Sequence, residues 1–414
     1  MGKKTTVFSF ALVCVAFLLQ VSAINAQPHQ EQPAHAAIPL GTMNVWEVQR
    51  HLFAQALGGV KETPEKNHVH IAVLSDLHLP GRITAKKEKA IETLNAWPDL
   101  DMVVILGDIC EDHGSVEEYA FAKQFLAKLN KPIYPVAGNH EYIYYDFNPF
   151  NTKEKAPKGK HVVAASGTLR REKLKRFKDT FSLKEVYYTK KVDPYLLVFL
   201  STDHLYVSYR TAISDNQLDW LRSELGKNRS TPTIIFFHGS LKGTFTGENL
   251  FDRDPVNYMV QPYQEIHKVI VENPQVFLWV SGHAHIAATN ANFNHPDNIY
   301  ERQVTNIHNS DMNGNSYLSE KDRKSTKHES IWTNSLFLYQ DRVVVKTYDH
   351  EKAAWMDSLT REIKLPKILS RIVPETPQRM TLLSEHSTHG TMAEQAQKRG
   401  QFCPREALRI GKTQ

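Results

Sequence analysis

Five short apolar runs in the sequence each end at a side chain that can bind a metal ion. The clearest run spans residues 102–106, is rich in β-branched residues, and is followed by Gly107 and Asp108. A continuous apolar run with such an end is typical of a strand that is buried on both faces. A buried carboxylate is costly unless a cation neutralises it. We therefore expect Asp108 to lie at the end of a strand and to face a cation.

Four other runs end in the same way. They are residues 71–75 before Asp76 and His78, residues 131–138 before Asn139 and His140, residues 233–237 before His238, and residues 276–282 before His283 and His285. One strand that ends in a polar residue is common, but five that share Asp, His and Asn indicate a single site. Open α/β sheets bind ligands at the carboxyl ends of their strands. We therefore predict that the five ends meet at the edge of a sheet.

Segments with helical spacing of apolar residues alternate with these runs. They span residues 85–94, 117–129, 169–177, 214–225 and 262–271. In the fourth segment, Ser214 or Asp215 can cap a helix. Two strands of a second sheet are expected at residues 187–189 and 196–200, and a hairpin at residues 335–339 and 343–348. This alternation of strands and helices predicts a layered α/β fold.

Composition divides the chain into four parts. Residues 1–26 have Lys3 and Lys4 before an apolar run from Val7 to Val21, as in a signal peptide. We expect a linker with one helix (residues 45–57) over residues 27–64, the catalytic domain over residues 65–350, and a basic extension over residues 351–414. Residues 287–329 lack periodicity and are expected to run over the surface beside the site.

The first of these parts predicts export. We expect a periplasmic or secreted protein whose mature chain, without residues 1–26, has no transmembrane span. The alternative is that the apolar segment stays uncleaved and serves as a membrane anchor. Residues 21–26 contain the small residues that two candidate cleavage sites require.

The composition of the whole chain excludes several classes of protein. With 41% hydrophobic and 23% charged residues, the chain matches globular proteins and is not disordered throughout. A net charge of +5 over 414 residues is too small to indicate nucleic-acid binding. Three cysteines, of which Cys14 lies in the predicted signal peptide, are too few for a disulfide scaffold.

The polar residues at the five strand ends have the composition of a metal site. In an extended chain, residues i and i+2 point the same way, so Asp76 can act together with His78, as can the two histidines of residues 283–285. Oxygen from Asp and Asn combined with imidazole nitrogen suits Zn, Mn or Fe better than Ca or Mg. The candidate ligands are Asp76, His78, Asp108, Asn139, His238, His283 and His285. Seven ligands are more than one tetrahedral metal ion requires, so we predict two transition metal ions. His140 is then left to act on the leaving group.

The same residues carry a resemblance to a known family. In chain order, the blocks are Asp76-Leu-His78, Gly107-Asp108, Gly138-Asn-His-Glu141, His238 and Gly282-His-Ala-His285. Each block alone occurs often by chance, whereas all five in this order resemble the calcineurin-like metallophosphoesterase superfamily over about residues 69–350. The resemblance implies an α/β fold of four layers, a β-sandwich flanked by helices. It also implies a metal-dependent enzyme that hydrolyses a small-molecule phosphomonoester or phosphodiester through a hydroxide that bridges two metal ions.

The resemblance further implies a role for each candidate residue. One metal ion is expected on Asp76, His78 and His285. The other is expected on Asn139, His238 and His283. Asp108 is the implied bridge, and His140 is the implied residue that stabilises the transition state or protonates the leaving oxygen.

Differences from two branches of the superfamily narrow the function. Protein Ser/Thr phosphatases have an arginine where this chain has Ala137, and an Asp-Arg-Gly group in the region of Glu111 and Asp112. A phosphoprotein phosphatase is therefore disfavoured. Purple acid phosphatases have a ligand tyrosine at the position of Glu111, so a tyrosinate-to-iron colour is not expected. The roles of Glu111 and Asp112 stay open.

The alternative to an enzyme is a non-catalytic scaffold that keeps the fold and acts through protein contacts. Such a scaffold usually loses a ligand or the residue at His140, and none is missing here, which favours the enzyme. The sequence leaves three classes of substrate open, namely cyclic nucleotides, other nucleotides and phospholipids. Selectivity is expected to lie in loops at residues 142–160, 242–259 and 287–329, which the sequence pattern does not fold.

Overall fold

The computed structural model describes residues 66–145, 164–244 and 255–366. The predicted signal peptide, the helix expected at residues 45–57 and most of the predicted basic extension lie outside the described residues. In the described part, no helix combines the length and apolar character that a membrane crossing needs.

The first sheet combines three parallel strands with an antiparallel hairpin. Its seven strands within the described residues have the order β14-β13-β12-β1-β2-β3, and β15 also pairs with β13. Their bounds are β1 Val69–Leu74, β2 Leu100–Ile105, β3 Ile133–Pro135, β12 Trp332–Leu338, β13 Arg342–Asp349, β14 Ala354–Trp355 and β15 Arg361–Lys364. In β1, Val73 lies opposite Val104 of the parallel β2 and Asn334 of the antiparallel β12. The expected hairpin is the pair β12 and β13.

The second sheet has the order β4-β5-β6-β7-β9-β8 in the described part. Its bounds are β4 Tyr188–Val192, β5 Tyr195–Phe199, β6 Thr233–Phe236, β7 Val276–Ser281, β8 Ile299–Tyr300 and β9 Val304–His308. The four strands β5, β6, β7 and β9 run parallel, so their carboxyl ends lie at one edge. The prediction of a second sheet containing β4 and β5 is confirmed. A separate small ladder joins β10 Asn315–Ser316 and β11 Thr326–Lys327.

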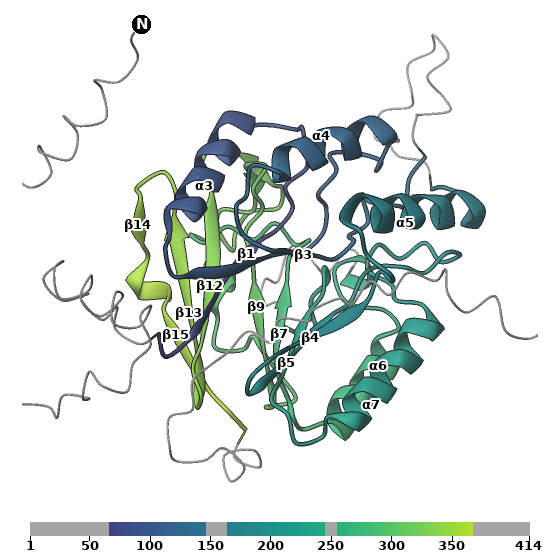
Figure 1. The fold of residues 1–414 in the computed structure, drawn as a ribbon, viewed down its shortest axis with the longest axis vertical. Helices are drawn as coiled ribbons and strands as arrows, with labels where there is room; N and C mark the ends of the chain where they lie inside the picture. Colours follow the sequence, from purple (N-terminus) through teal and green to yellow (C-terminus); the bar gives the residue numbers. More distant parts are fainter. Residues whose placement is uncertain (1–65, 146–163, 245–254, 367–414) are drawn as a thin grey trace, which may run out of the picture. The chain divides into compact units, whose positions relative to one another are not determined.

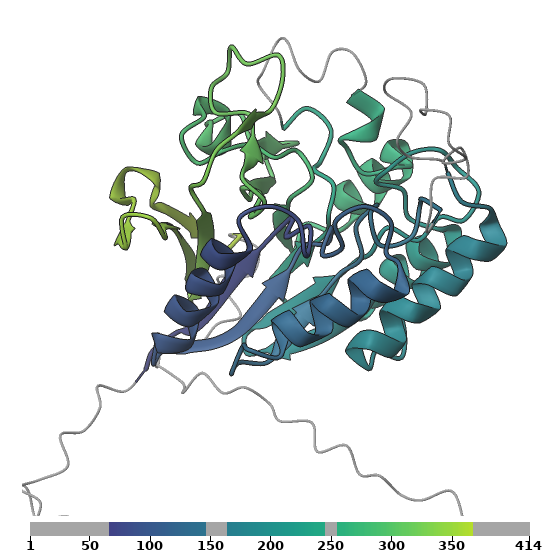
Figure 2. The ribbon, with the colours of Figure 1, turned by 90° about the horizontal axis from the view of Figure 1, so that it is seen from above.

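Helices cover the outer faces of the two sheets. They are α3 Thr84–Ala96, α4 Val116–Leu126, α5 Gly167–Phe181, α6 Asp215–Lys227 and α7 Tyr263–Glu272. Their starts follow local signals: Ser115 and Glu118 form a capping box at α4, and Ser214 Oγ accepts a hydrogen bond from Gln217 N at 3.2 Å at α6. Figures 1 and 2 show α3 and α4 on one side of the sheets and α6 and α7 on the other.

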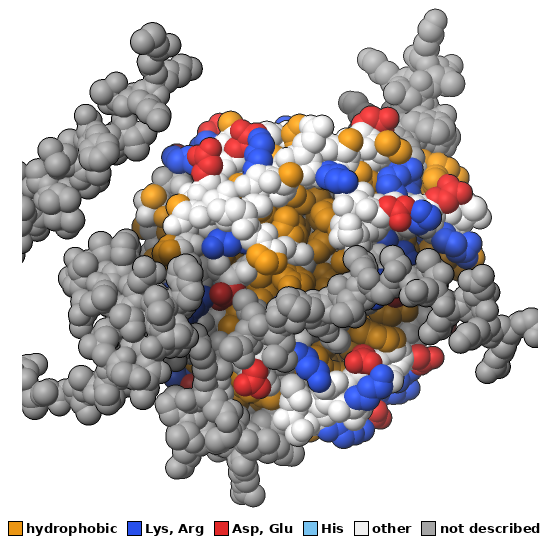
Figure 3. All heavy atoms as spheres, in the orientation of Figure 1, with side chains coloured by type: hydrophobic (Ala, Val, Ile, Leu, Met, Phe, Trp, Pro, Cys, Tyr) orange, Lys and Arg blue, Asp and Glu red, His pale blue; other side chains and the backbone are white. Residues whose placement is uncertain are grey.

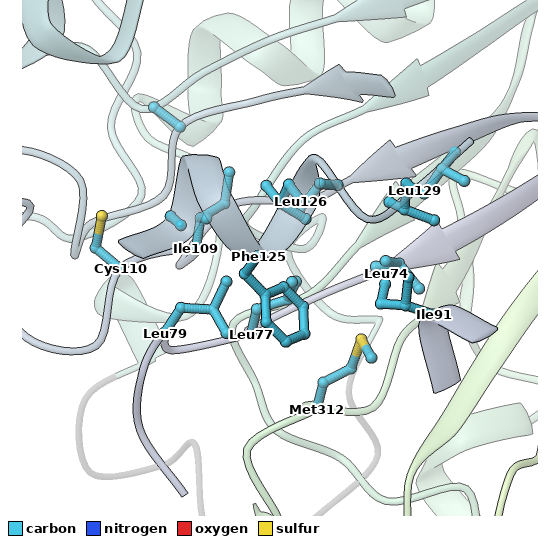
Figure 4. Packing of buried hydrophobic residues seen from close by; sticks show 14 of the residues in the cluster. Leu74, Leu77, Leu79, Ile91, Ile109, Cys110, Phe125, Leu126, Leu129 and Met312 are labelled. Carbon is cyan, nitrogen blue, oxygen red and sulfur yellow. The ribbon is translucent and has the colours of Figure 1, made fainter. Parts of the chain in front are cut away.

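Three apolar clusters lie between four layers. The first joins α3, α4 and α5 to the first sheet, and Figure 4 shows Leu74, Ile91 and Phe125 within it. The second lies between the two sheets, where Phe199 stacks on Phe236 with ring centroids 5.1 Å apart. The third lies between the second sheet and α6 and α7. Burial of one such side chain stabilises the fold by about 1.5–3 kcal/mol. The predicted helix–sheet–sheet–helix fold is confirmed.

The first sheet extends beyond the predicted domain end at residue 350. β15 pairs with β13, with Val343 opposite Ile363 and Val345 opposite Arg361, and Leu365 is buried in the cluster between the sheets. Residues 351–366 therefore belong to the domain and not to a draping extension. The sequence misled because β15 has only four residues, Arg361–Lys364, and three of them are charged.

The expectation that residues 287–329 run only over the surface is also wrong. β9 lies inside the second sheet beside β7, and Asn306, Ile307 and His308 are buried. Asn306 Nδ2 donates to Ser281 Oγ at 3.1 Å, and His308 Nε2 lies 2.8 Å from the carbonyl oxygen of Thr244. Because hydrogen bonds compensate these buried polar groups, β9 needs no apolar run and gives no periodic signal.

Charged side chains of both signs lie on the surface of the described part. Figure 3 shows Lys and Arg mixed with Asp and Glu on one face. Several form exposed pairs, such as Lys227 with Glu224 and Lys268 with Glu265. Exposed pairs of this kind contribute about 0–1 kcal/mol each, so they do not determine the fold.

Candidate metal centre

The predicted ligands lie where the two sheets meet. Strands β1, β2 and β3 of the first sheet precede Asp76, Asp108 and Asn139. Strands β6 and β7 of the second sheet precede His238 and His283. The expectation of a single sheet edge is therefore wrong, because the five strands belong to two sheets. The ends still converge, since the apolar cluster between the sheets packs the two sets of strands face to face.

Five of the predicted ligands have a left-handed backbone. The φ angle is 51° at Asp76, 44° at His78, 48° at Asp108, 63° at His283 and 48° at His285. Such angles are uncommon outside glycine and persist at functional sites where the surroundings hold them. We predicted that residues i and i+2 act together because side chains alternate along an extended strand. This alternation does not place these side chains, because their backbone is not extended. Left-handed turns after the strands place them.

The first group of candidate ligands brings together side chains from both sheets. It consists of Asp76, His78, Asp108 and His285, whose ligand atoms all lie within 4.8 Å of one another. His285 Nε2 is 3.2 Å from Asp76 Oδ1 and 3.4 Å from His78 Nε2. His78 Nε2 is 4.0 Å from Asp108 Oδ2. The group thus contains the three residues predicted for one metal ion together with the predicted bridge.

The second group adjoins the first and shares a residue with it. It consists of Asp108, His238 and His283, again with ligand atoms within 4.8 Å. His238 Nε2 lies 3.2 Å from Asp108 Oδ2 and 3.2 Å from Asn139 Oδ1, so Asn139 lies beside this group. Asp108 belongs to both groups, which is the arrangement that a bridging carboxylate requires.

Backbone carbonyls orient the histidine rings. The Nδ1 atoms of His78, His285 and His238 lie 3.1, 3.0 and 2.7 Å from the carbonyl oxygens of Glu111, Asn315 and Leu106. Because a carbonyl only accepts, Nδ1 carries a proton in each ring, and Nε2 faces the site. The Nε2 atoms of His78 and His285 lie 3.4 Å apart, a contact that a proton on one of them or a metal ion between them stabilises. In His283 the roles are reversed, since Nε2 bonds the carbonyl of Asn257 at 2.7 Å.

Buried carboxylates create a demand for positive charge at both groups. Asp76 and Asp108 are only 0% and 1% exposed. Burial lowers the pKa of His238, but Asp108 raises it to about 9. Burial likewise lowers the pKa of His285, and Asp76 raises it to about 10. Burial opposes ionisation of Asp108, yet His238 and His140 hold its pKa well below the usual value. Both groups therefore stabilise a cation, whether a proton or a metal ion.

Asp76 shows most directly that the residues present fit a metal ion. Its Oδ1 is buried and makes no hydrogen bond within the described residues. Its Oδ2 accepts hydrogen bonds from His283 N at 3.0 Å and from Ser75 Oγ. Gly282 is required beside it, since a Cβ there would collide with Ser75 Oγ. A buried carboxylate oxygen 3.2 Å from an imidazole nitrogen, with no aligned hydrogen bond among the described residues, fits Zn, Mn or Fe.

His140 lies beside the two groups and belongs to neither. Its Nε2 is 3.9 Å from Asp108 Oδ2, and its backbone N donates to Asp108 Oδ1 at 2.9 Å. Its ring meets those of His78 and Tyr144 edge to face, with centroids 4.7 and 5.3 Å apart. Burial lowers the pKa of His140 to about 4, although Asp108 opposes this effect. The ring is thus next to the candidate metal ligands and lines the pocket above them.

Glu141 has a positioning role that the sequence did not predict. Its carboxylate is fully buried and accepts hydrogen bonds from four backbone N–H groups. The donors are Gly138 at 2.6 Å, Asp108 at 2.8 Å, Ile109 at 2.7 Å and Cys110 at 3.0 Å. Burial and Asp108 raise the pKa of Glu141, whereas the N–H donors lower it. This carboxylate joins the turn that carries Asp108 to the turn that carries Asn139. Glu141 is the last residue of the motif block Gly138-Asn-His-Glu141. Its presence in that block is the sequence signal from which its role could have been predicted.

Glu111 and Asp112, whose roles the sequence left open, differ in position. Glu111 Oε2 accepts a hydrogen bond from Gly81 N at 3.0 Å, and its carbonyl orients His78. Asp112 is exposed and lies outside both groups, in a third set with His113 and Glu118. Glu118 there closes the capping box of α4, so a structural role accounts for that set.

A pocket of about 160 Å³ opens onto both groups. Its lining includes Ala284 of the last motif block, Tyr258, Tyr317 and Ser325 from two of the loops in which selectivity was expected, and Arg210, which lies outside those loops. The ring of Tyr258 packs against that of His283, with centroids 5.4 Å apart. These residues lie in loops that come together only in the folded chain. Their spacing in the sequence therefore does not show which of them reach the pocket.

The fold and the site together define a class of protein. Two groups of Asp and His side chains that share Asp108, at the meeting point of two sheets flanked by helices, are the features of a metallophosphoesterase. The family model of calcineurin-like phosphoesterases matches residues 69–287, more than half of the chain. The chain belongs to the calcineurin-like phosphoesterase family.

Two curated proteins are similar to parts of the chain. A 3',5'-cyclic-nucleotide phosphodiesterase of Nostoc sp. is 26% identical over 233 residues, which are 53% of this chain and 73% of that protein. A transmembrane protein with a metallophosphoesterase domain from Bos taurus is 32% identical over 83 residues, which are 20% of this chain and 19% of that protein.

Solved structures with low sequence identity are also similar. A purple acid phosphatase from yellow lupin (Lupinus luteus) is 14% identical with a TM-score of 0.47, over 72% of this chain and 54% of that chain. A dimetal phosphatase from Danio rerio is 13% identical with a TM-score of 0.45, over 72% of this chain and 99% of that chain.

We expect the purified chain to bind about two transition-metal equivalents after reconstitution, because its two ligand groups exceed one site. Asp108→Asn should lose both metal ions and nearly all hydrolytic activity, since a neutral amide does not bridge two cations as a carboxylate does. Metal analysis and a phosphoester assay measure both effects, with the exposed Asp112→Asn as the charge-matched control. One equivalent in the wild type, or full metal content in Asp108→Asn, would contradict the shared-carboxylate arrangement.

Glu141→Gln should lower the free energy of unfolding by about 2–6 kcal/mol, because the amide NH₂ faces two backbone N–H groups that then lack an acceptor. Urea unfolding measures this change, with the exposed Glu92→Gln as the control. If Glu141→Gln unfolds at the same urea concentration as the control, the four hydrogen bonds do not hold the two turns together.

Proposed function

We propose that the chain is an exported hydrolase that cleaves a phosphomonoester or phosphodiester of a small molecule at a centre of two metal ions. The observation that carries this proposal is the position of Asp108 in both ligand groups. A single shared carboxylate brings two cation sites close enough to act on one phosphoryl group. Membership of the calcineurin-like phosphoesterase family supports the same reaction.

The proposed ligands follow the two groups. Asp76, His78 and His285 would hold one metal ion. His238, His283 and Asn139 would hold the other, and Asp108, which belongs to both groups, would be shared between them. When bound, Mn, Fe or Zn ions would supply Lewis acidity and lower the pKa of water. The carbonyls of Glu111, Asn315 and Leu106 keep the imidazole lone pairs directed at these positions, so the chain itself fixes the ligand geometry.

His140 is proposed to act on the leaving group. Its ring lies at the pocket wall and outside both ligand groups, and its Nδ1 is buried without a hydrogen bond in the described part of the chain. Burial lowers the pKa of His140 to about 4, against the effect of Asp108, so near neutral pH the ring is uncharged and keeps one N–H. This N–H can stabilise negative charge on the departing oxygen.

An enzyme is favoured over a non-catalytic scaffold because the site is complete. All seven predicted ligands lie in or beside the two groups, and His140 lines the same pocket. The test is a panel of monoesters and diesters assayed with Mn, Zn, Fe and Mg. The panel should include 3',5'-cyclic nucleotides, since the similar protein from Nostoc is named for that activity. Absence of metal-dependent hydrolysis across the panel would favour the scaffold.

Export is proposed from Lys3, Lys4 and the apolar run from Val7 to Val21. Expressed with this segment in a bacterial host, the protein should reach the periplasm or medium, with a mature N-terminus near Ile24 or Gln27. N-terminal sequencing of the exported protein measures the cleavage position. A protein that retains Met1 in the membrane fraction would instead indicate an uncleaved anchor.

His140→Ala should keep both metal ions but lose about 10²–10⁴ in rate on an alkyl phosphoester, because the departing alkoxide needs a proton. The loss should be smaller on a nitrophenyl ester, whose leaving group departs without such help. Metal analysis and the two rate constants are compared with those of His267→Ala, a histidine outside the site. Loss of a metal ion, or equal slowing on both esters, would contradict the leaving-group role.

A further inference from the structure

Arg210 is a charged residue in the pocket that the proposed mechanism does not use. It lines the pocket together with His140, His283 and Tyr258. Among the described residues it is the only Lys or Arg in that lining. Its side chain is exposed, and within the described part the guanidinium forms no hydrogen bond or ion pair, whereas its backbone N donates to Asn257 Oδ1 at 3.2 Å. An arginine whose guanidinium has no partner among the described residues, at a candidate active site, is available to an anion.

The backbone holds Arg210 in a fixed place relative to the ligands. Asn257 accepts the hydrogen bond from Arg210 N, and its own carbonyl bonds His283 Nε2 at 2.7 Å. The next residue, Thr211, accepts a hydrogen bond from Gln261 N at 2.9 Å and donates through Oγ1 to Met259 O at 2.6 Å. One short segment, residues 257–261, therefore supports both Arg210 and a predicted metal ligand.

Arg210 shares its pocket with the second ligand group. The lining that contains Arg210 also contains His283 of that group, Asn139 beside it, and Tyr317. Asn139 is itself held in place, since its Nδ2 donates a hydrogen bond to Tyr144 OH at 3.2 Å. A phosphoryl group in the pocket would therefore have the ligand groups at its base and the guanidinium at its side.

We propose that Arg210 binds a charged non-bridging oxygen of the substrate and makes the site selective for phosphomonoesters. This inference rests on the proposed phosphoesterase function. Near neutral pH a monoester carries close to two negative charges, whereas a diester carries one and replaces an oxygen anion with a second ester group. Guanidinium pairs with phosphate oxygens through charge-assisted and often bidentate hydrogen bonds. It therefore contributes more to binding a dianionic monoester than a monoanionic diester.

The test compares two esters that share a leaving group, p-nitrophenyl phosphate and methyl p-nitrophenyl phosphate. Arg210→Gln should lower kcat/KM for the monoester roughly 10–100-fold, as expected for loss of hydrogen bonds to a charged group. The loss on the diester should stay below about fivefold, as for an exposed charge pair. Arg210→Lys should recover part of the monoester activity, because it keeps the charge and loses the planar fork.

A matched control removes the same charge elsewhere. Arg171 lies on α5, is exposed, and donates to Tyr206 OH at 3.5 Å. Arg171→Gln should leave both kcat/KM values at wild-type level, which separates a local contact from general attraction of anions. Unchanged metal content and melting temperature show that each variant is folded, as expected for an exposed side chain.

Binding of inorganic phosphate to the metal-loaded protein gives a readout without turnover. Calorimetry should show phosphate affinity reduced roughly 10–100-fold in Arg210→Gln and unchanged in Arg171→Gln. Equal losses on both esters, or unchanged phosphate affinity in Arg210→Gln, would overturn the assignment. If the wild type hydrolyses no ester of the wider panel, the proposed function fails, and the phosphate measurement still decides whether Arg210 binds the phosphoryl group.

Discussion

Two carboxylates and several imidazole rings are buried together where the two sheets meet, and this arrangement is stable only with positive charge present, on protonated histidines or on metal ions. Asp76 and Asp108 are almost completely excluded from solvent, and the Nε2 atoms of His78 and His285 face each other at 3.4 Å. A low-dielectric environment makes such contacts costly unless positive charge separates them. The pKa values of His238 and His285, which contact the two carboxylates, are raised for the same reason: the carboxylates stabilise positive charge beside them. The site therefore stabilises a bound cation even in the absence of substrate.

Each sheet holds the ligands of the other. His238 follows β6 of the second sheet, yet its Nδ1 bonds the carbonyl of Leu106 after β2 of the first. Asp76 follows β1 of the first sheet, yet its Oδ2 accepts a hydrogen bond from His283 N after β7 of the second. The ligand geometry thus depends on the packing between the sheets, to which Phe199 and Phe236 contribute. A change in the core between the sheets would move ligands that lie far from it in the sequence.

The turns that carry the ligands adopt strained conformations that other contacts hold in place. Left-handed backbone at Asp76, Asp108 and His283 costs energy in residues with side chains, and the structure maintains it through hydrogen bonds. Glu141 provides the largest share for the turn after β2, with three of its four N–H donors in residues 108–110. This rigidity fixes the ligands in advance, so binding of metal ions or substrate requires little reorganisation. Arg210 is held by the same means, through Asn257.

The sequence alone determined the layered α/β class, the strands that bear the ligands and the identity of the seven candidates, because apolar runs and their polar ends are local features. It did not determine β9, whose buried Asn306 and His308 replace an apolar signal with hydrogen bonds. Nor did it assign the five strand ends to two sheets, since pairing partners lie far apart in the chain. Only the tertiary structure decided the positions of Glu141 and Arg210 beside the site. A carboxylate that binds backbone N–H groups and an arginine at a pocket wall acquire their roles from distant neighbours, which no spacing in the sequence records.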